Sequence, residues 1–187
     1  MTEAKEAGKM AKFVAFLRGI NVGGHRKIPM ADLRGLLTSI TLDSNVQTYI
    51  ASGNAVFTAK GPAKSLSRAI AQGIKERFGF DVPVLVLTEN EIKAALETYP
   101  FAPGAGKAAL AYFCYDDPQI DQAGITALAA PTEEIAVVGR TVWLFAPDGI
   151  GRSKLAAKLE RLIGVETTAR NLNTVTKLVE MVGETRL

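Results

Sequence analysis

In the first half of the chain, a continuous run of apolar residues is followed by apolar residues at helical spacing. Residues 13–17 are apolar without interruption, which predicts a strand in the middle of a sheet. A helix is expected from Pro29, because proline is favoured in the first turn and apolar residues then recur at every third or fourth position. These residues are Met30, Leu33, Leu37 and Ile40.

Two runs typical of strands follow, at residues 46–50 and 55–58, on either side of the Ser-Gly-Asn turn at 52–54. This pattern predicts a hairpin of antiparallel strands. Apolar spacing then predicts a helix over residues 63–79, and residues 82–87 read as a strand. The resulting order, β-α-β-β-α-β, is that of the ferredoxin-like fold.

The second half echoes this order after a linking helix. That helix opens with the capping box Thr88-Glu89-Asn90-Glu91, and the Pro/Gly-rich segment 101–106 follows it. The expected later elements are strand 109–115, helix 119–130, strands 134–138 and 141–145, a helix from Ser153 to Gly164 and a closing helix over 173–182.

We therefore predict an α+β protein with two ferredoxin-like (βαββαβ-type) subdomains in tandem and a C-terminal helix that packs across them. Residues 1–11 are expected to form a disordered leader. The first subdomain is expected at 12–88, the linking helix and loop at 89–106, and the second subdomain with the closing helix at 107–187.

Composition narrows the classes of function. The 187 residues include one cysteine and one histidine, so the usual structural zinc sites cannot be assembled, and we expect neither metal nor cofactor. No apolar run is long enough to span a membrane and no signal peptide is evident, which predicts a cytoplasmic protein without a membrane partner. The net charge of +3, from 22 basic and 19 acidic residues, is too small to indicate a dedicated nucleic-acid binder.

The loop 18–27 is the strongest candidate for a binding site. It joins the expected central strand to the N-terminus of a helix, where free backbone N–H groups favour an anion. Gly19 and Gly24 have the spacing of a nucleotide P-loop, but His25-Arg26 stands where that motif requires Lys followed by Ser or Thr. A structural explanation stays open, in which the glycines permit positive φ and Asn21 caps the connection.

Three further segments combine turn or cap residues with polar side chains. The turn 52–54 is explained by the hairpin alone, and Ser153, which precedes Lys154, is a good helix N-cap. Residues 170–174, Arg-Asn-Leu-Asn-Thr, place four polar groups at the start of the closing helix, more than a cap requires. Each segment therefore allows either a structural or a ligand-binding role.

We hypothesise that the loop 18–27, the turn 52–54 and the helix start 170–174 meet at one cleft that binds a small anionic or phosphorylated ligand. Arginines would supply bidentate contacts, the glycine loop N–H donors, and the asparagines orientation. The ligand-binding residues of this hypothesis are Arg18, Gly19, Asn21, Gly23, Gly24, Lys27, Ser52, Asn54, Lys154, Arg170, Asn171 and Asn173. No general base is evident, so catalytic residues and enzymatic activity stay unassigned.

Two other classes of function are compatible with the sequence. The strand with Tyr112 and Tyr115 is similar to the aromatic strand of a sheet that stacks RNA or single-stranded DNA bases, which requires its rings to be exposed beside basic residues. The strands of the first half lack matching aromatic residues, so packing of these rings in the core is the favoured alternative. Alternatively, the polar segments hold the two halves in register in a regulatory or partner-binding module. Cys114, in the same apolar run, is poorly placed to ionise as a nucleophile.

Several segments resemble the hallmark segments of the domain-of-unknown-function 1697 family of bacterial proteins. They are residues 13–24, 46–57, 153–155 and 168–175. The resemblance implies a two-subdomain α+β fold of ferredoxin-like type and no established activity. Leu172 stands where the family leads us to expect tryptophan, which bears on stacking or packing at that position.

Overall fold

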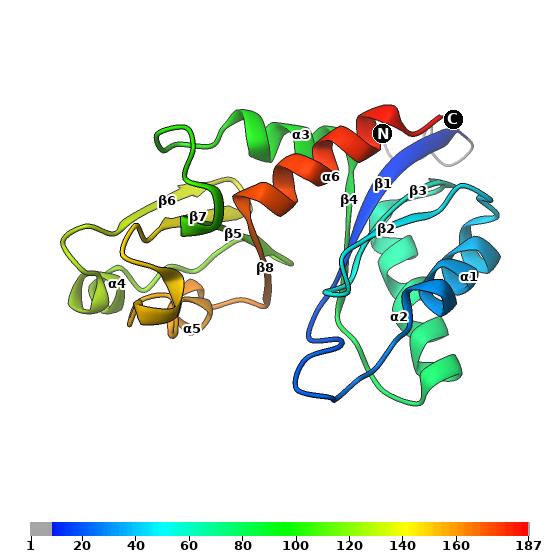
Figure 1. Cartoon of the computed structure of the whole chain (residues 1–187), viewed down its shortest axis with the longest axis horizontal. Coiled ribbons are helices and arrows are strands. Elements are labelled where there is room, and N and C mark those ends of the chain that lie inside the picture. The colour runs from blue at the N-terminus through cyan, green and yellow to red at the C-terminus, as the bar shows by residue number, and fades with distance from the viewer. Residues whose placement is uncertain (1–8, 187) are drawn as a thin grey trace. The chain divides into compact units, whose positions relative to one another are not determined.

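The computed structural model describes residues 9–186, which divide into two compact units. The first unit runs to Lys93 and includes the residues from Leu178 onward, and the second comprises Ala94–Lys177. Each unit contains its own four-stranded antiparallel sheet (Figure 1). The two units are therefore described separately.

The first unit has the strand order β2-β3-β1-β4, in which every neighbouring pair is antiparallel. Helices α1 and α2 pack together on one face of this sheet (Figure 1). This is the ferredoxin-like arrangement that the order of elements predicted. The elements are β1 (Met10–Leu17), α1 (Met30–Thr41), β2 (Gln47–Tyr49), β3 (Asn54–Lys60), α2 (Ala63–Phe78) and β4 (Val84–Thr88).

Strand β1 is central because it is paired on both edges and buried on both faces. It pairs with β3 on one side and β4 on the other. Phe13, Ala15 and Leu17 pack with the residues of α1 and α2. Val14 and Phe16 point to the opposite face and are also fully buried. The predicted central position of this run is confirmed.

Helices α1 and α2 approach each other closely at a glycine. A Cβ at Gly73 would lie 3.0 Å from Leu36 Cδ1 and 3.1 Å from Ile40 Cδ1, so a larger residue would require these two side chains to shift by a few tenths of an ångström.

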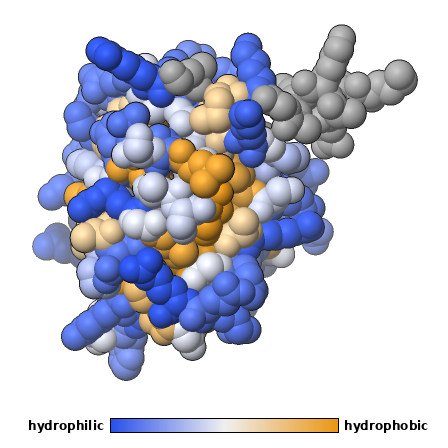
Figure 2. Space-filling view, turned by 90° about the vertical axis from the view of Figure 1, so that its right-hand side faces the viewer, coloured by the Kyte–Doolittle hydropathy of each residue, from blue (hydrophilic) through white to orange (hydrophobic). Residues whose placement is uncertain are grey.

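Figure 2 faces the right-hand side of Figure 1 and shows a strip of hydrophobic surface flanked by hydrophilic groups. The outer surface of this side is therefore mixed in character.

The second unit has the equivalent strand order, β6-β7-β5-β8, so the predicted α+β fold is confirmed in both halves. Among residues 9–186, no helix is both long enough and apolar enough to cross a membrane. The elements of this unit are β5 (Ala109–Cys114), α4 (Gln122–Leu128), β6 (Glu134–Val138), β7 (Thr141–Phe145), α5 (Leu159–Ile163) and β8 (Thr167–Asn171). The remaining helices are α3 (Glu89–Glu97), the short 3-10 helices η2 (Gly106–Ala108) and η3 (Ile150–Arg152), and α6 (Leu172–Glu184).

Two elements of the second unit differ from the sequence prediction. The pattern does not predict β8, because its residues are mostly polar and it is an edge strand that pairs only with β5. The helix expected from Ser153 begins instead at Leu159. Residues 154–158 form turns in which the Lys158 N–H donates to the Leu155 carbonyl at 3.0 Å, one residue short of an α-helical bond.

The start of α3 agrees with its predicted capping box. Glu91 N–H donates to Thr88 Oγ1 at 3.2 Å, and Thr88 N–H donates to Glu91 Oε2 at 2.8 Å. The leader expected over residues 1–11 falls outside the described residues as far as residue 8. Met10 and Ala11 belong to β1.

Tyr112 lies in the core of the second unit. Its side chain is 6% exposed and packs in a cluster with Leu159 and Leu162 of α5. Burial raises the pKa of its phenol to about 12, and Glu160 adds to the effect. A ring in this position is not available for base stacking, so it gives no support to the nucleic-acid hypothesis.

We predict that the thiol of Cys114 reacts slowly in the folded protein. It is 2% exposed, and burial raises its pKa to about 11 against the opposing effect of Arg140. At about pH 8 its thiolate fraction is then roughly 100-fold lower than that of an ordinary thiol. Alkylation by iodoacetamide, followed by mass spectrometry, should be slower in buffer than in urea by at least this factor. Equal rates would contradict the buried placement.

Candidate functional site

The connection between β1 and α1 leaves the sheet at a point held from both sides. The N–H of Leu17 donates to the carbonyl of Gly53 at 2.8 Å. The next N–H, of Arg18, donates to the carbonyl of Pro83 at 3.0 Å. Residues that precede β3 and β4 therefore fix where this loop begins.

The loop itself folds into a miniature hairpin. Val22 and His25 form an antiparallel bridge around Gly23 and Gly24, whose φ angles are 58° and 81°. Two successive positive φ values are those of a tight hairpin turn. The glycines expected to bind a ligand therefore also close the turn.

Asn21 holds the loop together through three hydrogen bonds of its side chain. Its Nδ2 donates to the carbonyls of Ile28 (3.0 Å) and Ala51 (2.8 Å), and its Oδ1 accepts from the Ile28 N–H (2.9 Å). The two ends of the loop and the turn between β2 and β3 are thereby joined. Because both amide protons are donated within the fold, Asn21 has a structural role in the loop, and its part in orienting a ligand stays a prediction.

The turn between β2 and β3 is held in a similar way. Asn54 has no exposed surface, and its Nδ2 donates to the Tyr49 carbonyl (3.0 Å) and Ser52 Oγ (3.1 Å). Ile50 and Gly53 have positive φ angles of 48° and 87°. Ser52 and Asn54 therefore shape the hairpin that supports the loop.

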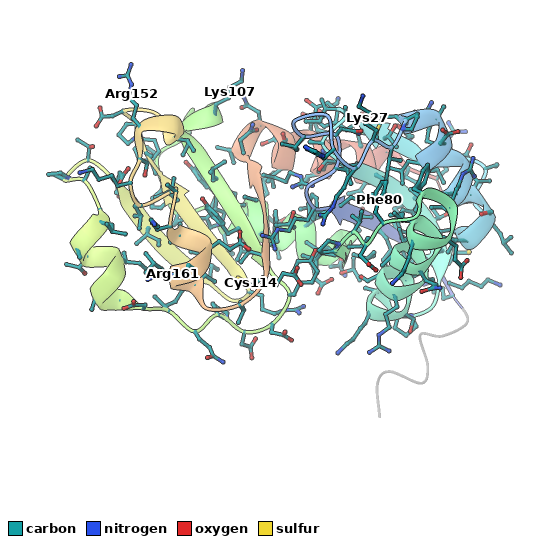
Figure 3. The ribbon with its side chains drawn as sticks, turned by 90° about the horizontal axis from the view of Figure 1, so that it is seen from below. Lys27, Phe80, Lys107, Cys114, Arg152 and Arg161 are labelled. Carbon is teal, nitrogen blue, oxygen red and sulfur yellow. The ribbon has the colours of Figure 1, made fainter. Side chains whose placement is uncertain are left out.

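Basic side chains gather on the outside of the loop. Residues 25–27, His-Arg-Lys, are all exposed, and Lys27 lies on the connection between β1 and α1 (Figure 3). Arg18 is half-buried at the start of the loop. The next acidic residue along the chain, Asp32, lies 3.5 Å from the guanidinium of Arg77. The loop 18–27 therefore carries basic residues and no acidic residue.

A hollow of about 400 Å³ lies beside these residues, at the start of α1. No side chain caps the first turn of this helix, so its first N–H groups lack the usual side-chain partner. Within residues 9–186, no group of three or more His, Cys, Asp or Glu side chains is placed to hold a metal. The hollow is lined by Asn21, Gly24, Lys27, Ile28, Pro29, Met30 and Ala51.

The remaining candidate residues lie in the second unit. Lys154 lines a separate hollow of about 370 Å³ that also contains Glu133 and Asp148. Arg170, on β8, donates to Thr168 Oγ1 (3.0 Å) and to the Ala169 carbonyl (2.8 Å). Burial lowers the pKa of this guanidinium to about 10, and Tyr115 partly offsets the effect.

At the start of α6, Asn171 has a structural role. Asn171 Oδ1 accepts from the Thr174 N–H at 2.9 Å, which is an N-cap hydrogen bond. Asn173 is exposed, whereas Leu172 is buried, so this position packs inside the protein. The participation of Lys154 and of residues 170–173 in ligand binding stays a prediction.

Two of the three predicted segments, the loop 18–27 and the turn 52–54, are brought together in the first unit. The sequence pattern does not identify Ile28, Met30 and Ala51 as residues that line the hollow. Met30 falls on the apolar stripe of a helix and is packed partly against the core. Its spacing along the chain therefore cannot distinguish a core residue from one that lines a binding site. The contribution of Ala51 is a backbone carbonyl, which no residue type reveals.

Comparisons with known proteins agree with the predicted resemblance. The model of the family described as proteins of unknown function, DUF1697, matches residues 10–143. The solved structure of a conserved bacterial protein from Streptococcus pneumoniae is similar, with a TM-score of 0.68 and 23% sequence identity. This similarity covers 93% of this chain and 99% of that one, and at such identity it shows the fold alone. No curated protein matches the chain.

We expect Gly53→Ala to destabilise the protein by about 3 kcal/mol and the control Gly139→Ala by about 1 kcal/mol. Both glycines have positive φ, 87° and 56°. A Cβ at Gly53 would lie 2.7 Å from Leu17 Cβ, whereas nothing lies within 4 Å of one at Gly139. Urea unfolding followed by circular dichroism measures both, and equal losses would contradict the close approach of turn and strand.

Proposed function

This chain belongs to the DUF1697 family of proteins of unknown function, and from the structure of its first unit we propose that it binds a small anionic or phosphorylated ligand. The proposed site is the loop 18–27, supported by the turn 52–54. The observation that carries the proposal is the strained backbone of this loop beside exposed cations.

Five residues between positions 19 and 26 have positive φ: Gly19, Asn21, Gly23, Gly24 and Arg26. For the two that are not glycine, this conformation costs about 1–2 kcal/mol each. Such strain persists only where surrounding contacts enforce it, and here the Asn21 hydrogen bonds do so.

The side chains around this backbone complement it. Arg26 offers a planar fork suited to two oxygens of a phosphate or carboxylate, and Lys27 offers a compact charge. Gly23 and Gly24 carry no side chain that would keep a ligand away from their N–H groups. Arg18 extends the basic group toward the sheet.

The equivalent connection in the second unit provides an internal contrast. The segment between β5 and α4, residues 115–121, contains Asp116, Asp117 and Asp121 and no glycine. It occupies the same place in the order of elements but has the opposite charge. The ferredoxin-like topology does not require a basic glycine loop at this place, which supports a function for the loop in the first unit.

The proposal concerns binding, because no general base is assigned beside the loop. Nucleic acid stays as the second candidate, since a basic loop also suits a phosphate backbone. The buried position of Tyr112 favours the small ligand, because it removes a stacking platform that base recognition would use.

We predict that the double variant Arg26→Gln/Lys27→Gln binds phosphate and pyrophosphate about tenfold more weakly than the unmodified protein, because two charge-assisted contacts are lost. The control Lys64→Gln/Arg68→Gln removes the same charge from exposed positions of α2 and should change the affinity less than about twofold. The measurement is a titration followed by amide chemical shifts, in which the Gly23 and Gly24 N–H signals should move.

Stationary Gly23 and Gly24 signals, or an equal loss in the control, would exclude the loop as the site. Affinity confined to oligonucleotides and falling steeply with salt would favour nucleic-acid binding. If no anion and no oligonucleotide binds, the regulatory or partner-binding module becomes the better hypothesis.

A further inference from the structure

We infer that the ligand of this site is amphiphilic: a phosphate or carboxylate group joined to an apolar body that occupies the hollow beside the basic residues. The inference rests on the proposed function, since it concerns the same loop. It adds which class of anion the site prefers.

The wall of the hollow is mainly apolar. Of the lining residues, Ile28 is buried, Met30 is half-buried, and Pro29 and Ala51 are exposed. The amide of Asn21 is the other polar side chain in the lining besides Lys27, and both its N–H donors are given to Ile28 and Ala51 carbonyls. A ligand body in the hollow therefore meets hydrocarbon for the most part.

The charge of the described lining comes from a single residue. Of the described residues that line the hollow, Lys27 alone is charged, and it follows directly on Arg26 in the loop. An anion bound at these residues places whatever is attached to it against Ile28 and Met30. A sugar phosphate would bring hydroxyl groups to a wall that offers them few partners, which is unfavourable.

Two exposed apolar side chains adjoin the hollow along the chain. Val22 is 66% exposed and Ile50 is 50% exposed. They neighbour Asn21 and Ala51, the two residues whose hydrogen bond joins the loop to the turn. Exposed apolar surface beside an apolar hollow gains free energy when a ligand covers it.

The size of the hollow limits the apolar body. A volume of about 400 Å³ lies at the low end of the roughly 300–1,000 Å³ typical of small-molecule sites. A single ring or a short alkyl chain fits such a space. The same chemistry is found in soluble phosphomonoesters and in anionic lipid headgroups with their acyl chains, so both sources are tested.

The experiment measures affinity for inorganic, methyl, butyl and hexyl phosphate by isothermal titration calorimetry. We predict that affinity rises up to about threefold to fourfold per added methylene until the hollow is filled. Met30→Gln should flatten this series, whereas Lys27→Gln should weaken every member. Leu42→Gln, a matched apolar-to-polar change after the opposite end of α1, should preserve the series.

Each outcome separates this inference from the proposed function. Phosphate binding with no dependence on chain length overturns the inference and leaves the anion site. No binding by any member overturns both.

If Met30→Gln strongly lowers the unfolding midpoint, a competition experiment on the unmodified protein replaces this variant. Added phenyl phosphate should then flatten the alkyl phosphate series and shift the Met30 signals. Failure to compete overturns the inference. If hexyl phosphate binds, tighter binding to phosphatidylglycerol vesicles assigns the natural ligand to an anionic lipid, and weaker binding to the vesicles assigns it to a soluble ester.

Discussion

The first unit depends on the double pairing of β1 and its burial on both faces. Pairing with β3 and β4 satisfies the backbone of this strand, and burial of both its faces selects apolar side chains over residues 13–17, so polar side chains begin where the strand ends. That end is held by bonds to the Gly53 and Pro83 carbonyls. The glycine loop therefore emerges at a fixed point, which is what a binding site on a loop requires.

Asn21 holds the rest of the loop in place. Its three side-chain hydrogen bonds join residues that are 7 and 30 positions away along the chain. They offset the strain of a backbone with several left-handed residues, and they leave the neighbouring cations exposed. The loop is thus arranged before any ligand arrives, so that binding does not have to order it.

The two units share a strand order but not a surface chemistry. The connection after the first strand is basic and glycine-rich in one unit, and acidic and without glycine in the other. The buried positions of the two units are similar in character, since β1 and β5 both carry apolar side chains. Topology constrains which residues are buried, and it leaves the loops free to differ in function.

The sequence by itself determined the order of elements in the first unit, the hairpin at 52–54 and the capping box at Thr88, because these follow from spacing and local backbone chemistry. It did not reveal the edge strand β8, whose polar residues lack the apolar signal of a buried strand. The tertiary structure alone decided that Tyr112 is buried and that Asn21 bonds to Ala51. Such partners are distant along the chain, and local patterns carry no information about which distant groups folding brings into contact.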